Sequence, residues 1–160
     1  MKIEIHKILC PTDFSVSAEH AFNYALAIAA RHGATVELLH VTEGSAYANE
    51  ESLDGEAPGE TYEDRVRAQL RQIADTANTA VSIDTKLVSG IPYVEILSRA
   101  TSLKADLIVI GTHGRTGMKQ FLIGSVAEKV VRTSSCPVCT IRHPDHVVMG
   151  DESRSGDTSK

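Results

Sequence analysis

The sequence has few cysteines and no long apolar run, and each absence excludes a class of protein. Cys10, Cys136 and Cys139 are the three cysteines, too few and too unevenly spaced for a secreted disulfide scaffold. No apolar run approaches the roughly 18 to 20 residues that a membrane helix requires. The first ten residues, MKIEIHKILC, lack the apolar centre of a signal peptide. We therefore expect a soluble protein of the reducing cytoplasm, with no membrane partner.

A cluster of Lys and Arg is also absent, and the formal net charge is −5. A nucleic-acid surface needs a basic stripe that neutralises phosphates, so we expect no nucleic-acid partner. A chain of 160 residues is expected to form a single domain. Such a chain buries about 70% of the surface that its unfolded form exposes, so it needs no disulfide or metal to fold.

Apolar periodicity alternates along the chain between the patterns of strand and helix. It predicts strands at 3–10, 35–41, 81–88, 107–110 and 137–142. The first helix begins at Ser15 or Ser17, and the second begins with Thr61 and Asp64 as its cap. Pro92 opens the third helix, and Ser125 opens the fourth with a capping box. The acidic, glycine-containing stretch 43–60 is predicted to be a flexible insertion, and the polar tail 143–160 is predicted to be disordered.

Strands separated by helices require crossover connections. They predict a single doubly wound α/β domain over residues 1–142, with a five-stranded parallel sheet and helices on both faces. In the strand order 3-2-1-4-5, three segments would surround one crevice beyond the carboxyl ends of the strands, where such sheets bind ligands. These are Pro11-Thr12-Asp13, Val41-Thr42 and the glycine loop after the fourth strand.

The glycine loop follows the apolar run 107–110 and precedes the fourth helix. Its glycines lie at positions 111, 114, 117 and 124. Glycines allow backbone N–H groups to approach a phosphate, and the N-terminus of a helix favours negative charge. The loop fits neither the dinucleotide fingerprint G-x-G-x-x-G after a first strand nor the Walker A pattern, which requires Gly-Lys-Ser/Thr.

The spacing Gly111-x2-Gly114-x9-Gly124-Ser125, with the segments GTHGRTG, IGSVAEKVVR and KILCPTDFS, resembles the ATP-binding branch of the universal stress protein family. The resemblance covers about residues 3–142. It implies a Rossmann-like, adenine nucleotide alpha hydrolase-like fold that binds ATP and Mg²⁺. It also implies a homodimer through strand 137–142.

The resemblance assigns a role to each matching position. The backbone of Val41 would bind the adenine edge, and Pro11 and Asp13 would lie beside the ribose and the phosphate-bound metal, with Asp13 as the metal ligand. The loop from Gly111 would wrap the ribose and phosphates, and the segment from Gly124 would bind the distal phosphates. The implied nucleotide-binding residues are Pro11, Thr12, Asp13, Val41, Gly111, Thr112, His113, Gly114, Arg115, Gly117, Gly124, Ser125 and Val126. Thr112 stands where serine or alanine is frequent in the family.

Structural roles remain open for several of these residues. Ser125 and Asp13 can each serve only as a helix cap, and Gly111 and Gly124 can serve only tight turns. His113 lacks a nearby nucleophile, which favours bracing of the loop over catalysis.

The sequence Cys136-Pro137-Val138-Cys139 invites redox or zinc interpretations. Alternation on a strand turns its two thiols to opposite faces, which favours packing. His40 is likewise expected to pack within or beside the sheet.

Such a site is compatible with two main functions. The first is a nucleotide-dependent regulator or sensor, in which ATP occupancy stabilises one conformation and alters the binding of a protein partner that the sequence does not identify. The second is a slow ATPase or phosphotransferase that uses Asp13, His113 and Arg115, although no known catalytic motif unites them. A scaffold that binds no nucleotide is the poorest alternative, because the glycines and Ser125 are intact.

Overall fold

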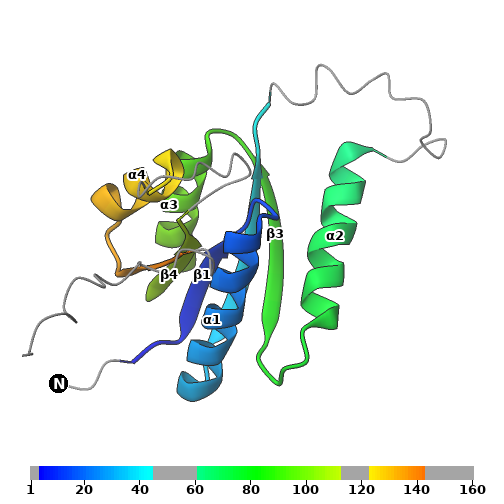
Figure 1. The fold of residues 1–160 in the computed structure, drawn as a ribbon. Coiled ribbons are helices and arrows are strands. Elements are labelled where there is room, and N and C mark those ends of the chain that lie inside the picture. Colours follow the sequence, from blue (N-terminus) through cyan, green and yellow to red (C-terminus); the bar gives the residue numbers. More distant parts are fainter. Residues whose placement is uncertain (1–3, 45–60, 113–122, 143–160) are drawn as a thin grey trace, which may run out of the picture.

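The structure is a computed structural model, and it describes residues 4–44, 61–112 and 123–142. Five strands form one parallel sheet (Figure 1) in the order β3-β2-β1-β4-β5, which confirms the predicted topology. The strands are β1 (Lys7–Pro11), β2 (Thr35–Thr42), β3 (Ile83–Ser89), β4 (Leu107–Gly111) and β5 (Val138–Ile141). The reversal of winding lies between β1 and β4, so ligands are expected beyond the carboxyl ends of these two strands.

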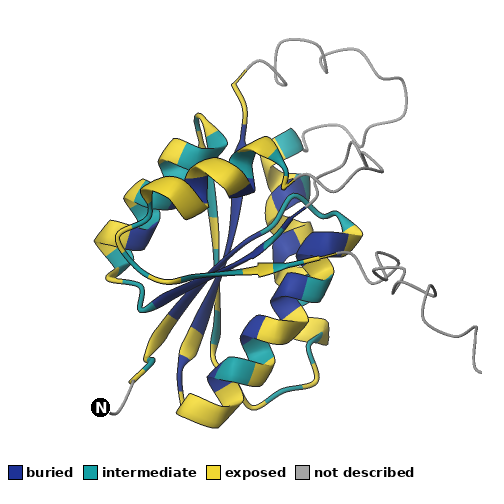
Figure 2. Cartoon of the chain, turned by 60° about the vertical axis from the view of Figure 1, so that its left-hand side comes forward, coloured by how far each residue is buried: buried dark blue, intermediate teal, exposed yellow. Residues whose placement is uncertain are grey.

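Four helices cover the two faces of the sheet. They are α1 (Val16–His32), α2 (Tyr62–Thr76), α3 (Pro92–Leu103) and α4 (Ser125–Thr133). Alternation along β1 sends Ile8 and Cys10 into the core under α1 and α2, and Leu9 into the core under α3 and α4. Figure 2 shows the central strands as the buried layer between the helices. The fold is therefore doubly wound, as predicted.

Two strands begin at least two residues later than predicted. The first strand begins at Lys7, because its pairing with β2 begins at Lys7 and Thr35, and it includes Pro11, which pairs with Leu39. The third strand begins at Ile83, where its pairing with Val36 of β2 begins. Both predictions began too early because they followed apolar composition, whereas the strand begins only where a neighbouring strand pairs with it.

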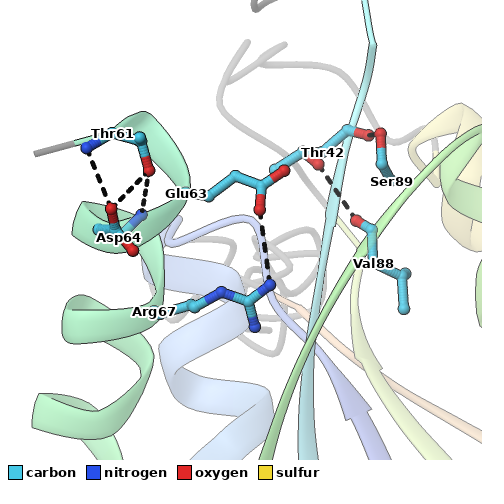
Figure 3. A network of polar contacts seen from close by, with 7 residues as sticks. All are labelled: Thr42, Thr61, Glu63, Asp64, Arg67, Val88 and Ser89. Atoms are coloured by element: carbon cyan, nitrogen blue, oxygen red, sulfur yellow. Dashed lines mark hydrogen bonds and ion pairs between the residues drawn. The ribbon is translucent and has the colours of Figure 1, made fainter.

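The helix caps fix where α1 and α2 begin. Ser15 is the N-cap of α1, and its side chain accepts a hydrogen bond from the Ala18 N–H, which decides between the two predicted starts. Thr61 and Asp64 form the predicted capping box of α2, with Asp64 Oδ2 at 2.7 Å from Thr61 Oγ1 (Figure 3). These hydrogen bonds lower the pKa of Asp64 below its ordinary value.

The carboxyl ends of β2 and β3 are joined by side chains as well as by backbone. Thr42 Oγ1 donates to the Val88 carbonyl at 3.2 Å, and Ser89 Oγ donates to the Thr42 carbonyl at 3.3 Å (Figure 3). The predicted insertion is described only at residues 43 and 44, and its remainder lies outside the described residues, as does the predicted tail 143–160. No helix in the described part of the chain is long and apolar enough to cross a membrane.

One ion pair joins α3 to the interior of the sheet. Glu37 of β2 is buried, and its carboxylate accepts two hydrogen bonds from the Arg99 guanidinium, at 2.6 Å to Nε and 2.5 Å to Nη2. These bonds raise the pKa of Arg99 above its ordinary value. A two-bond contact of this kind fixes the position of α3 along β2.

Candidate functional site

A pocket of about 230 Å³ lies at the carboxyl ends of the strands. It is bordered by the ends of β1, β2 and β4 and by the first turns of α1, α3 and α4. Nine predicted site residues are described, and all nine line this pocket: Pro11, Thr12, Asp13, Val41, Gly111, Thr112, Gly124, Ser125 and Val126. The other four, His113, Gly114, Arg115 and Gly117, lie outside the described residues.

The turn between β1 and α1 forms one wall of the pocket. Thr12 Oγ1 accepts from the Phe14 N–H, and Asp13 Oδ1 accepts from the Ser15 N–H, both at 3.0 Å. Asp13 thus supports the turn before α1, while Ser15 caps the helix itself. The carboxylate also lines the pocket, so its structural contact and a ligand contact are compatible.

Gly111 is required by packing, a role that the sequence did not reveal. A Cβ at this position would lie 2.8 Å from the Ser17 carbonyl carbon and 3.0 Å from the Ala18 nitrogen. Both atoms belong to the backbone of α1 and cannot move aside cheaply. The glycine therefore allows α1 to lie directly against the end of β4, whatever it contributes to a ligand.

Thr112 connects three parts of the site through its backbone. Its N–H donates to the Ile141 carbonyl at 2.8 Å, and its carbonyl accepts from the Gly124 N–H at 2.6 Å. The residue is 3% exposed. Thr112 therefore holds the start of α4 beside the end of β4 and also bonds to the end of β5.

The start of α4 corrects one prediction. Gly124, with φ −56° and ψ 149°, is the N-cap, and no side chain caps the helix, so the predicted capping box of Ser125 and Glu128 is wrong. The Glu128 N–H donates to the Gly124 carbonyl, which makes Ser125 the first helical residue. The Glu128 carboxylate instead meets Arg132 at 3.1 Å.

The N–H groups in the first turn of a helix have no acceptor within the helix. At α4 this turn begins with Ser125 and Val126, which line the pocket and bring the positive end of the helix dipole to it. Apolar residues also line the pocket: Leu39, Val41, Pro92, Ile96 and Ile110. This lining suits a ligand that combines an apolar ring with an anionic group.

Four of these apolar lining residues were not predicted: Leu39, Pro92, Ile96 and Ile110. Their signal was periodicity, because Leu39 precedes Val41 by two positions on a strand and Ile96 follows Pro92 by four on a helix. His40 packs in the sheet as predicted and is 4% exposed.

Among the described residues of the site, one carboxylate could bind a metal. Asp13 is the only charged residue among the described residues that line the pocket. No group of three or more His, Cys, Asp or Glu suited to a metal is found in the described part of the chain. Mg²⁺ bound with a nucleotide takes one or two carboxylates together with phosphate oxygens, so the donor set fits a metal that arrives with phosphate.

Cys136, which precedes β5, and Cys139, which lies in β5, face different cores. Cys136 packs with the core under α3 and α4, and Cys139 with the core under α1 and α2, which confirms the prediction of opposite faces. Both thiols are free, as is that of Cys10. Their packing on different faces of the sheet favours a structural role over a shared redox or zinc centre.

The family model for the universal stress protein family matches residues 4–142. This chain belongs to that family. A universal stress protein of Methanocaldococcus jannaschii is 34% identical over 143 residues, covering 86% of this chain and 82% of the relative. The structure of universal stress protein UspA from Lactobacillus plantarum matches with a TM-score of 0.68 and 33% identity, covering 88% and 100% of the two chains.

A universal stress protein solved in complex with cAMP has the same fold. It matches with a TM-score of 0.66 and 25% identity, covering 88% of this chain and 98% of that one. The resemblance in the glycine motif is thus confirmed at the level of the family.

Proposed function

We propose that this universal stress protein binds ATP together with Mg²⁺ in the pocket at the carboxyl ends of its strands. The observation that carries the proposal is the meeting of Asp13, Val41 and the first turn of α4 around one pocket. These residues support a binding mode in which adenine lies against Val41 and the neighbouring apolar side chains. Ribose and metal would then lie beside Asp13, and the phosphates would lie at the N-terminus of α4. The relative in complex with cAMP supports an adenine nucleotide as the ligand class.

Within this proposal the protein is a regulator, and bound ATP stabilises the arrangement of α4 and the β1–α1 turn that a protein partner recognises. A slow ATPase or phosphotransferase is the alternative. Among the described lining residues the one candidate base is Asp13, and its Oδ1 already accepts the Ser15 N–H. This favours binding over catalysis, because hydrolysis needs a group placed to orient the attacking water.

The assembly proposed with this function is a homodimer through residues 137–142. Strand β5 is an edge of the sheet, and Val138, Cys139 and Ile141 are half-buried there. An edge strand with apolar side chains can pair with its copy across a two-fold axis. Sedimentation at high concentration should give a dimer, and a monomer under those conditions would contradict this part of the proposal. The free thiols support the reducing cytoplasm as the proposed compartment.

The identity of the nucleotide is tested by mass spectrometry of material released from the purified protein by acid. We expect ATP or its product ADP in near-stoichiometric amount. Stripped protein should then regain a higher melting temperature with ATP and Mg²⁺ than with cAMP. Release of cAMP alone, or stabilisation by cAMP alone, would contradict ATP as the ligand while leaving the pocket as a nucleotide site.

A further inference from the structure

His40 occupies a position in the sheet where an apolar residue would be expected. Along β2, Val36 and Leu38 point into the core under α1 and α2, and alternation places His40 next in the same row. The residue is 4% exposed and is absent from the residues that line the pocket. A buried imidazole carries a penalty unless its polar atoms are bonded, so its partners indicate why it is there.

One ring nitrogen of His40 bonds to the turn that forms the pocket wall. Nδ1 lies 2.7 Å from the Thr12 carbonyl oxygen. A carbonyl oxygen can only accept, so Nδ1 carries the proton and donates. The Thr12 N–H in turn donates to the carbonyl of Leu39 at 2.8 Å. Both backbone polar groups of Thr12 are therefore held by consecutive residues of β2.

The imidazole ring also supports the far side of the same turn. Its centroid lies 4.5 Å from that of Phe14, with 29° between the ring planes. Phe14 has φ +65°, the left-handed region that a phenylalanine rarely adopts. A residue in this conformation persists only where its surroundings hold it, and the stacked ring is such a support.

Asp13 lies between these two held residues. His40 therefore contacts the turn on both sides of Asp13, by a hydrogen bond to Thr12 and by stacking on Phe14. His40 itself does not line the pocket, whereas Asp13 does. We propose that His40 is a positioning residue that holds the Thr12–Asp13–Phe14 turn in the shape that presents Asp13 to the ribose and metal of the nucleotide. This inference rests on the proposed function and adds a residue outside the ligand's reach.

Two substitutions separate the hydrogen bond from the ring. His40→Phe keeps an aromatic ring against Phe14 and removes the donor to Thr12. His40→Asn places an amide nitrogen the same number of bonds from the backbone as Nδ1 but removes the ring. We expect both variants to remain folded. His40→Phe should loosen the turn, and His40→Asn should loosen it less because its amide can still donate to the Thr12 carbonyl.

The first measurement needs no ligand. Amide hydrogen exchange of Ser15, whose N–H donates to Asp13 Oδ1, reports whether the turn is intact. We expect roughly tenfold faster exchange in His40→Phe than in the parent protein, and about threefold in His40→Asn. Unchanged Ser15 exchange in His40→Phe would overturn the proposal, because the turn would then hold without the bond.

The second measurement is the affinity for ATP with and without Mg²⁺. The Mg²⁺-dependent gain in affinity should fall about tenfold in His40→Phe, whereas Mg²⁺-free ATP should lose only the smaller contribution of the ribose contact. Equal loss in both conditions would mean a general structural defect and would overturn the positioning role. If the parent protein binds no nucleotide, the proposed function fails and the inferred purpose of the turn fails with it, while altered Ser15 exchange would still establish that His40 holds the turn.

Discussion

Two aspartates at opposite ends of the sheet show how the two ends differ. Asp106 precedes β4 at the amino end, and its Oδ2 accepts from the backbone N–H groups of His6 and Lys7 at 2.8 and 2.9 Å. Asp13 follows β1 at the carboxyl end, where one oxygen accepts from Ser15 and the side chain lines the pocket. The first carboxylate serves the fold alone, and the second serves both the fold and the site.

The same contrast extends to other polar groups. In the amino half of the sheet, Glu37 is bonded to Arg99. At the carboxyl end, the first turn of α4 has no side-chain cap, and its N–H groups lie beside the pocket. At the carboxyl end of this sheet, helix N–H groups that have no acceptor within the helix therefore lie at the same pocket as the carboxylate of the turn before α1. Substitutions in the amino half should change stability alone. Those at the carboxyl end should change binding, except at Gly111, where packing against α1 sets stability as well.

The largest effect is expected in the amino half, from Arg99→Met. The change leaves the buried Glu37 carboxylate without its cation and should lower the free energy of unfolding by about 3 kcal/mol. Urea denaturation measures it. The control is Glu37→Leu combined with Arg99→Met, which removes both charges and should fall within about 1 kcal/mol of the parent protein. Equal losses in the single and double variants would show that the charge pairing has no special role.

A pair of glycine substitutions should separate binding from folding. Gly124 has a negative φ, so Gly124→Val is tolerated by the backbone but puts a branched side chain beside the first turn of α4. We expect it to weaken ATP binding at least about a hundredfold with little change in melting temperature. Gly111→Ala drives a Cβ into the backbone of α1 and should lower stability by about 2 kcal/mol. Calorimetry and thermal denaturation of both variants would contradict the assignment if the two effects were exchanged.

Conversion of each aspartate to asparagine provides a matched comparison of the two ends. Asp13→Asn should weaken binding of ATP with Mg²⁺ about tenfold, because the amide is a poor metal ligand. Asp106→Asn should leave that affinity unchanged and lower stability at pH 7 by about 1 kcal/mol, a value limited by exposure to solvent. An effect of Asp106→Asn on affinity would contradict the separation of the two ends.

The pH dependence of Asp106 has a defined sign. Hydrogen bonds from His6 and Lys7 lower the pKa of Asp106 below its ordinary value. The ionised carboxylate therefore stabilises the folded state above the unfolded pKa of about 4, and this contribution is lost as the pH falls through the folded pKa. The stability difference between the parent protein and Asp106→Asn should shrink below about pH 4. A difference that stays constant from pH 7 to pH 3 would contradict this origin.

The smallest effect is expected from thiol chemistry. Burial raises the pKa of the Cys10 thiol to about 12, whereas Cys136 and Cys139 are half-buried. A thiol reagent at pH 8 should therefore modify two cysteines of the folded protein and the third only after unfolding. Replacement of Cys136 and Cys139 by serine should leave ATP affinity within about twofold. Fast modification of Cys10 would contradict its position in the core.

Much of the fold was predictable because periodicity and caps are local signals. Thr61 and Pro92 start their helices as predicted, and Ser15 is one of the two predicted starts of α1. Gly33 ends α1 with φ +67°. The start of α4 was not, because Gly124-Ser125 allows either residue to be the N-cap and only the backbone conformation decides. Strand ends were misplaced where they depend on the neighbouring strand, as at Lys7 and Ile83.

The pocket lining was predictable from sequence where it consists of motif residues. Contacts between distant segments were not predictable from sequence. The approach of Ser17 to Gly111 depends on how α1 lies on the sheet, and the bond from His40 to Thr12 spans 28 positions. The left-handed conformation of Phe14 has no residue-type signal, since glycine is the usual residue there.

Binding of ATP with Mg²⁺ in the pocket at the carboxyl ends of the strands can be measured by isothermal titration calorimetry of nucleotide-free protein with ATP in excess Mg²⁺. We expect saturable binding at one site per chain with an affinity on the order of micromolar, lost in Gly124→Val. Absence of heat together with an unchanged melting temperature at millimolar ATP would contradict it.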